Sequence, residues 1–470
     1  MNDVEAHLAE NFDSYVEELK AFCAIPSVST NPAFAEAVGR AATFTADRLR
    51  RAGFYAVELF ETGRHPLVLG EWLGAPGAPT IVVYGHYDVQ PPDPLEKWLT
   101  PPFEPTVRDN RLYARGASDD KGPLLIPILV AEALLKLRGS LPLNVKMLIE
   151  GEEEIGSPSF DNAVGRLKDR LACDLVVSAD GAMWRADLPS VTVASRGMVA
   201  LDVTVIGAGK DLHSGRHGGS APNPIRALAA LLATMHDGEG NVAIEGFHDG
   251  ASLPDPAILE AIHAARFDAG RYCDEIGAPR PDPLPAGGDL LVRQWLRPTL
   301  EFNGIFGGYS GPGTKTVIPS SASAKITCRL VAGQEPEAVA EAIRRHCEGH
   351  QPSGYAIEIA RHGPGTPAFA LDPTVPALHH VEAILEQLYG KRPLRVAMGA
   401  TVPIGTVFRE TLGVPCIFFS FATSEDEYHA PNEFFRLEKL REGLIAWARL
   451  FERLGGPEAA SLVGISAEQI

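Results

Sequence analysis

The chain has 470 residues, of which 45% are hydrophobic and 22% charged, and its formal net charge is -18 at pH 7. That length exceeds what one hydrophobic core supports, so we expect at least two domains. The negative charge argues against a nucleic-acid partner, because phosphate binding depends on clustered Lys and Arg. No apolar run approaches the roughly 20 residues that a membrane helix needs, so we expect no membrane partner.

The start of the chain and its cysteines predict a cytoplasmic protein. Val4, Leu8, Phe12, Val16 and Leu19 recur at helical spacing, which predicts that the chain opens with one amphipathic helix. This start lacks the basic and then apolar pattern of an export signal. The six cysteines are scattered without any Cys-x-x-Cys, which is typical of reduced, buried thiols.

The order of predicted elements indicates an α/β protein with an insertion. From about residue 79 to 181, strand-like runs alternate with a helical stretch at 124–137, as in a mostly parallel sheet flanked by helices. Two strand-and-helix blocks then indicate a smaller α+β, ferredoxin-like domain. Its predicted strands are 199–206, 322–331 and 355–360, its helices are 224–235 and 335–347, and 238–299 is a long excursion.

After the insertion the first pattern returns. A helix is predicted at 374–389, a strand at 416–419 and a final helix at 437–454. We therefore expect a catalytic domain made of residues 1–194 and 367–470, with the smaller domain, 195–366, inserted into it.

Residues that can bind metal follow four of the short apolar stretches. His86 and Asp88 follow the stretch at 81–84, and Asp180 follows the stretch at 175–177. The stretches at 143–149 and 416–419 lead to Glu152–Glu154 and to His429, and an acidic loop with Asp119 and Asp120 precedes the helix at 124–137. In open α/β sheets, ligands bind outside the carboxyl ends of the strands, so these side chains point to one pocket.

Each of these residues also has a plain structural explanation. A lone His86 is more often structural than a ligand, and Asp119 or Asp120 could simply cap a helix. The run Glu152–Glu154 could be a solvated surface, but its neighbours look buried, and adjacent carboxylates repel one another unless a cation compensates. Imidazole and carboxylate ligands without cysteine suit zinc, cobalt or manganese.

Seven sequence blocks, in order, carry a specific resemblance over nearly the whole chain. The sequence resembles the di-metal metallopeptidase and deacylase family that includes carnosinase, cytosolic non-specific dipeptidase, glutamate carboxypeptidase and succinyl-diaminopimelate desuccinylase, and its carnosinase-like dipeptidase branch most of all. The blocks are GHYDVQP, GASDDKGP, EGEEEIGS, SADG, KDLHSG, KTVIP and YHAPNE.

The resemblance implies a role for individual residues. His86 and Asp180 would hold one metal ion, Glu154 and His429 the other, and Asp119 would bridge them. Two divalent ions per subunit are implied, zinc first, with manganese or cobalt as alternatives. Glu153 matches the general base and Asp88 the residue that orients His86, while Glu152 replaces a variable position. In the inserted domain, His213 matches an oxyanion donor that acts from the partner subunit, Arg329 matches the residue that binds the substrate carboxylate, and Thr316, Gly399 and Thr401 fall in substrate-binding segments.

The implied function is hydrolysis of the amide bond of dipeptides or short peptides with a free C-terminal carboxylate, by a metal-bridging water that Glu153 activates. A homodimer would form through the inserted lid domain. The alternative is a deacylase or carboxypeptidase that acts on N-acyl amino acids, and a more distant one is a metal-binding scaffold without catalysis. Residues 207–210 and 308–316 are similar to nucleotide-binding loops, but the spacing of their glycines and lysines does not fit those motifs. A serine hydrolase is not expected either, because the chain has no Gly-x-Ser-x-Gly motif to present a nucleophilic serine.

Overall fold

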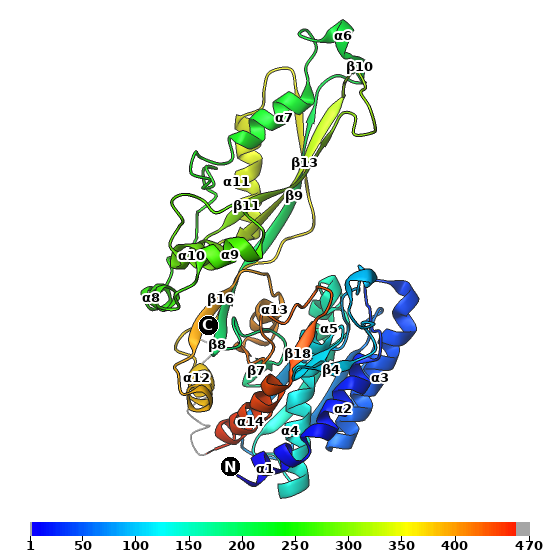
Figure 1. Ribbon diagram of the computed structural model, residues 1–470, viewed down its shortest axis with the longest axis vertical. Coiled ribbons are helices and arrows are strands. Elements are labelled where there is room, and N and C mark those ends of the chain that lie inside the picture. The colour runs from blue at the N-terminus through cyan, green and yellow to red at the C-terminus, as the bar shows by residue number, and fades with distance from the viewer. Residues whose placement is uncertain (1, 457–470) are drawn as a thin grey trace. The chain divides into compact units, whose positions relative to one another are not determined.

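The structure is a computed structural model that describes residues 2–456, and it divides into two compact units (Figure 1). Unit 1 takes the chain up to Val193, then Leu371–Val396, and continues from Ile404. Unit 2 takes Ala194–Ala370 and the short segment Ala397–Pro403. This division differs from the predicted one mainly at residues 397–403, which lie in unit 2.

A six-stranded sheet forms the centre of unit 1. Its strand order is β1-β2-β6-β3-β7-β17, and β6, β3, β7 and β17 run parallel while β2 runs antiparallel to both of its neighbours. The mostly parallel α/β sheet is therefore confirmed. The strand bounds are β1 Tyr55–Phe60, β2 Leu67–Trp72, β3 Thr80–His86, β6 Asn144–Glu150, β7 Leu175–Ser178 and β17 Cys416–Phe418.

Helices cover both faces of this sheet. Side chains alternate along β3, so Gly85 faces Leu124 of helix α4, whereas the Tyr84 ring contacts Phe160 and Phe408 on the opposite face. Helices α3 and α14 pack against α4, as Figure 1 shows, and α5 and α13 pack together. The bounds are α3 Ala35–Ala52, α4 Gly122–Arg138, α5 Phe160–Arg166, α12 Pro376–Tyr389, α13 Ile404–Leu412 and α14 Leu437–Leu454.

Unit 2 is built on a four-stranded antiparallel sheet of order β11-β13-β9-β14. Its chain order, with one helix after β9 and another after β13, is the ferredoxin-like arrangement, as predicted. Alternate residues of β9 and β13 are buried, and they form one core with helices α7 and α11. The bounds are β9 Gly197–Ile206, α7 Pro224–Ala233, β11 Thr299–Gly307, β13 Ser321–Leu330, α11 Pro336–Gly349 and β14 Ala356–Arg361.

Shorter elements complete the described chain. A small sheet of order β18-β5-β4 lies within unit 1, β10 pairs with β12 in unit 2, and the chain passes between the units at β8, β15 and β16. The bounds are β4 Thr106–Arg108, β5 Arg111–Tyr113, β8 Ser190–Ser195, β10 Leu212–His213, β12 Val317–Ile318, β15 Phe369–Ala370, β16 Leu394–Met398, β18 Phe434–Arg436, α6 Ser214–His217, α8 Pro256–Ala264, α9 Ala269–Glu275 and α10 Gly287–Leu296.

Two expectations about elements were wrong. The opening helix is two helices, α1 (Asp3–Glu10) and α2 (Phe12–Cys23), because Asn11 ends the first by donating its side-chain amide to the His7 carbonyl at 2.8 Å. Strand β11 was not predicted, because a bulge between Phe302 and Gly304 interrupts its alternation and most of its side chains are exposed.

The cysteines agree with the expectation of reduced, mostly buried thiols. All six cysteines are free thiols, and five of them are buried. Every helix between residues 2 and 456 is too short or too polar to cross a lipid bilayer.

The core of unit 2 can be tested at Ile326, in the middle of β13. Its side chain is 1% exposed, so Ile326→Ala should lower the free energy of unfolding by about 2–5 kcal/mol. Lys325→Ala, on the exposed side of the same strand, removes only an ion pair to Asp202 at 3.3 Å and should cost about 1 kcal/mol or less. Urea unfolding measures both, and equal losses would contradict the assigned core face.

Candidate metal centre

The strand ends of unit 1 bring acidic and histidine side chains to one edge of the sheet. Strand β3 ends at His86, β6 ends four residues before Glu154, and β7 ends two residues before Asp180. These three strands are parallel neighbours, so their carboxyl ends lie side by side. Asp119 lies in the turn Ala117–Lys121 that leads into α4.

Two groups of possible metal ligands share one carboxylate. His86, Asp119 and Asp180 form the first group, and Asp119, Glu154 and His429 form the second. Within each group, one ligand atom from every residue lies within 4.8 Å of the others. The Oδ1 atom of Asp119 lies 3.0 Å from His86 Nε2, and its Oδ2 atom lies 2.9 Å from His429 Nε2.

Asp88 fixes the orientation of the His86 ring. His86 Nδ1 lies 3.1 Å from the main-chain oxygen of Asp88 and 3.4 Å from its Oδ1 atom. Both are acceptors, so Nδ1 carries a hydrogen and Nε2 is directed at Asp119. The Oδ2 atom of Asp88 accepts the main-chain N–H of Glu154 at 3.1 Å, which links the loops after β3 and β6.

Burial and mutual repulsion act on the carboxyl groups of this cluster. Burial, followed by the charge of Asp119, raises the pKa of Glu154 to about 7, and burial also raises the pKa of Asp180 to about 6. Burial raises the pKa of Glu153 well above its usual value, although the nearby His86 opposes this shift. The cluster therefore holds more negative charge than its surroundings stabilise.

The two imidazoles respond in the opposite direction. Hydrogen bonds with Asp119 and Glu154 raise the pKa of His429 to about 10. Burial lowers the pKa of His86, but hydrogen bonds with Asp119 and Asp88 outweigh it and raise the pKa above its usual value. In a neutral His86 ring, whose hydrogen is on Nδ1, the Nε2 lone pair would face an Asp119 oxygen, an arrangement that requires a proton or a metal ion between them. A donor set of imidazoles and carboxylates with no thiolate fits zinc, manganese or cobalt.

The run of three glutamates divides into different environments. The Glu152 carboxylate is buried away from the two ligand groups, where it accepts the main-chain N–H groups of His65 at 2.9 Å and Ser159 at 3.2 Å. The charge on Glu153, in contrast, interacts with His86 and Asp180. These hydrogen bonds indicate that Glu152 stabilises the two loops that contain His65 and Ser159.

Glu433 is a buried residue whose role the sequence analysis missed. Its carboxylate accepts the main-chain N–H groups of Gly116 at 3.0 Å, Ser118 at 2.9 Å and Asp119 at 3.2 Å, and it pairs with Arg115 at 2.7 Å. Glu433 thereby ties the loop that carries Asp119 to the segment that carries His429. Its position four residues after His429, in the same sequence block, was the available signal.

The remaining predicted site residues lie in unit 2 and form two small groups. In one, His213 lies on β10, with its Nε2 atom 3.4 Å from Thr316 Oγ1. In the other, Arg329 on β13 donates from Nη1 to Thr401 Oγ1 at 2.6 Å, and Gly399 lies in the same segment as Thr401.

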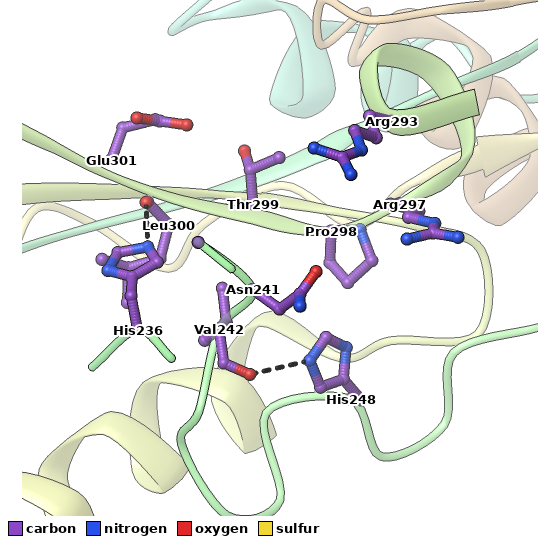
Figure 2. Close-up of a pocket in the computed structure, with 11 residues that line it drawn as sticks. His236, Asn241, Val242, His248, Arg293, Arg297, Pro298, Thr299, Leu300 and Glu301 are labelled. Carbon is purple, nitrogen blue, oxygen red and sulfur yellow. Dashed lines mark hydrogen bonds between the residues drawn. The ribbon is translucent and has the colours of Figure 1, made fainter. Parts of the chain in front are cut away.

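A cavity of about 440 Å³ also lies in unit 2, beside strand β11 (Figure 2). Figure 2 shows Arg293, Arg297, Asn241 and His248 around it, with His248 bonded to the Val242 carbonyl. None of the predicted site residues lines this cavity.

Comparison with known proteins supports the resemblance. Human Beta-Ala-His dipeptidase is 29% identical over 461 residues, which cover 93% of this chain and 90% of the relative. The Cys-Gly metallodipeptidase DUG1 of Candida albicans is 29% identical over 450 residues, which cover 89% of this chain and 90% of the relative.

Solved structures give the same result. Human carnosine dipeptidase 1 superposes with a TM-score of 0.80 at 29% identity and covers 96% of this chain and 98% of its own. The M20 family metallo-carboxypeptidase Sso-CP2 from Sulfolobus solfataricus has a TM-score of 0.81 at 28% identity, with 93% and 98% covered. The family model described as Peptidase family M20/M25/M40 matches residues 82–453, so the chain belongs to this peptidase family and is an enzyme.

Proposed function

We propose that this enzyme hydrolyses the amide bond of dipeptides or short peptides that carry a free C-terminal carboxylate. The observation that carries the proposal is the pair of ligand groups that share Asp119, because two adjacent cation sites suit hydrolysis of an amide. The names of the similar proteins, a Beta-Ala-His dipeptidase and a Cys-Gly metallodipeptidase, support dipeptides as the substrate class.

We assign the metal ligands by the two groups. His86 and Asp180 would hold one divalent ion and Glu154 and His429 the other, and Asp119, which belongs to both groups, would contribute to each. Zinc is the metal we propose, because imidazole and carboxylate oxygen together are common zinc ligands. When bound, such a pair of ions polarises the scissile carbonyl and acidifies a water molecule.

Glu153 is the proton carrier in this proposal. It accepts a proton from the attacking water and delivers it to the nitrogen of the leaving amine. Burial raises the pKa of Glu153 above the usual value of a glutamate, so this carboxylate binds a proton more firmly than an exposed glutamate does.

His213 is proposed as the donor to the oxyanion. Its Nδ1 atom accepts the main-chain N–H of Gly215 at 3.0 Å, so in the neutral ring the hydrogen is on Nε2. The side chain is exposed, and that N–H is therefore available to an oxygen that develops negative charge. Thr316 lies on the same side of the ring.

Arg329 is proposed to bind the substrate carboxylate. A guanidinium presents several N–H donors in one plane and suits bidentate recognition of a carboxylate. The hydrogen bond to Thr401 holds this side chain in place, and Gly399 lies in the same short segment as Thr401.

A cytoplasmic homodimer is the proposed state of the enzyme. Ile225, Ile305 and Phe306 on unit 2 are 40%, 61% and 55% exposed, and Ile305 and Phe306 lie on β11, an edge strand of the sheet. Exposed apolar side chains beside an open strand edge are typical of an interface between subunits. Six free thiols agree with a reducing compartment.

The choice between a dipeptidase and a deacylase or carboxypeptidase is open to a direct test, and the similarity to a metallo-carboxypeptidase gives the alternative its support. We expect the metal-loaded enzyme to cleave dipeptides with a kcat/KM at least tenfold above that for N-acetyl and N-succinyl amino acids. Hydrolysis of the acylated compounds alone would replace the dipeptidase assignment.

Replacement of Glu153 separates catalysis from metal binding. Glu153→Gln should lower kcat by about 100- to 10,000-fold while the metal content stays near that of the wild type. Asp119→Asn should instead lower metal content and, through lost binding linkage, thermal stability. Elemental analysis, steady-state kinetics and thermal melts measure these effects. A Glu153→Gln enzyme with the wild-type kcat would rule out the base assignment.

Metal uptake should release protons at pH 7. In the metal-free protein the pKa of His429 is raised to about 10, so its ring is protonated at pH 7 and must lose that proton to become a ligand. Calorimetric titration with zinc in buffers of different ionisation enthalpy should give about one proton or more released per protein. The number should fall in His429→Ala, and a count of zero in the wild type would contradict this assignment.

A further inference from the structure

The cavity beside β11 in unit 2 is shaped by a short, well-bonded turn (Figure 2). His236 and Val242 form an antiparallel bridge, and residues 237–241 make the turn between them. The Asp237 carboxylate fixes this turn, because it accepts the main-chain N–H of Asn241 at 2.9 Å and its side-chain amide at 3.0 Å. The end of α10 and the start of β11 line the cavity from the other side. The cavity is therefore preformed by the fold of unit 2.

Two arginines that line this cavity have no counter-ion among the described residues. Neither Arg293 nor Arg297 forms an ion pair there, whereas Arg271, which precedes them in the same part of the chain, pairs with Glu275 at 2.7 Å. The acid among the lining residues is Glu301, and Figure 2 shows it at the opposite end of the cavity from both arginines. The arginine end of the cavity thus has two positive charges that residues 2–456 do not balance.

The two histidines of the cavity are oriented by main-chain carbonyls, as the dashed lines in Figure 2 show. His236 Nε2 lies 3.1 Å from the Leu300 oxygen. His248 Nε2 lies 3.2 Å from the Val242 oxygen. Because a carbonyl oxygen only accepts, both Nε2 atoms carry a hydrogen, and in neutral rings both Nδ1 atoms are acceptors. The histidines can therefore accept hydrogen bonds from the hydroxyl groups of a ligand, and Val242, Pro298 and Leu300 add apolar surface.

Charge and size together indicate the kind of ligand. A phosphate monoester carries about -1.5 to -2 charges at pH 7 and has three acceptor oxygens, so one such group matches two guanidiniums. A single carboxylate carries one negative charge and would balance only half of the pair. The volume of about 440 Å³ falls within the roughly 300–1,000 Å³ that is typical of sites for small organic molecules. The cavity therefore suits a phosphate group that is attached to a small organic body.

We propose that this cavity is a second ligand site of the enzyme and binds a small organic phosphate whose body carries hydroxyl groups. Arg293 and Arg297 bind the phosphate group, and His236 and His248 accept hydrogen bonds from the body. An exposed arginine alone needs no counter-ion, so the inference rests on two of them at one end of a preformed cavity. None of the residues proposed for amide hydrolysis lines this cavity, so the site goes beyond that function.

Calorimetric titration of the metal-loaded enzyme with glycerol 3-phosphate tests the site. We expect a Kd of about 1 mM or below, and no detectable binding of glycerol. Arg293→Gln and Arg297→Gln should each raise this Kd by about 10-fold or more, the effect expected when a hydrogen bond to a charged group is lost. Arg392→Gln is the matched control, because Arg392 is an exposed arginine of unit 1 that does not line the cavity, and it should leave the Kd unchanged. Thermal melts without ligand check that each variant folds.

The arginine variants distinguish this cavity from the metal centre, because bound metal ions can themselves hold phosphate oxygens. Equal affinity for glycerol 3-phosphate in the wild type and both arginine variants would place the ligand elsewhere and refute the site, as would a wild-type enzyme that does not bind it. Inorganic phosphate should bind more weakly because it lacks the organic body, and equal affinity would overturn that part of the assignment. Tighter binding of succinate would overturn the choice of phosphate. None of these measurements depends on which peptide the enzyme cleaves.

Discussion

Buried negative charge at the carboxyl edge of the unit 1 sheet is the constraint on which the rest of the site depends. Asp119, Glu154 and Asp180 meet there, and no lysine or arginine in the described residues forms an ion pair with them. Taking uncompensated carboxylates out of water costs several kcal/mol each. Two imidazoles offset part of this cost only while they remain protonated. Divalent cations would offset more of this cost, and they would bind to the same imidazole nitrogens and carboxylate oxygens.

Other buried carboxylates fix the loops that carry these mutually repelling acids. Asp88, Glu152 and Glu433 are buried, but each accepts main-chain N–H groups instead of meeting further acids. Hydrogen bonds of this kind stabilise an ionised carboxylate and fix the loop that donates them. The acidic composition of this chain therefore has two structural uses: some acids form the site, and others position the loops that carry it.

What the sequence could predict depended on how far apart the contacting residues lie in the chain. His86 and Asp180 directly follow strands, so strand patterns alone placed them at one edge. His429 lies well beyond the end of β17, so the strand pattern pointed to it only weakly, and the family resemblance supplied its role as a ligand. Glu433 was missed because its partner is far away in sequence: its carboxylate contacts Arg115, 318 positions back. Local periodicity carries no information about such contacts.

The two units have complementary charge requirements. The cluster of unit 1 has excess negative charge and requires cations, whereas Arg329 in unit 2 is proposed to bind a carboxylate. Binding energy from a carboxylate remote from the scissile bond serves to orient that bond. Both a dipeptide and an N-acyl amino acid carry this carboxylate, so the proposed contact with Arg329 cannot distinguish between them. Selection between these two classes must therefore come from residues that contact the amino or acyl side of the scissile bond.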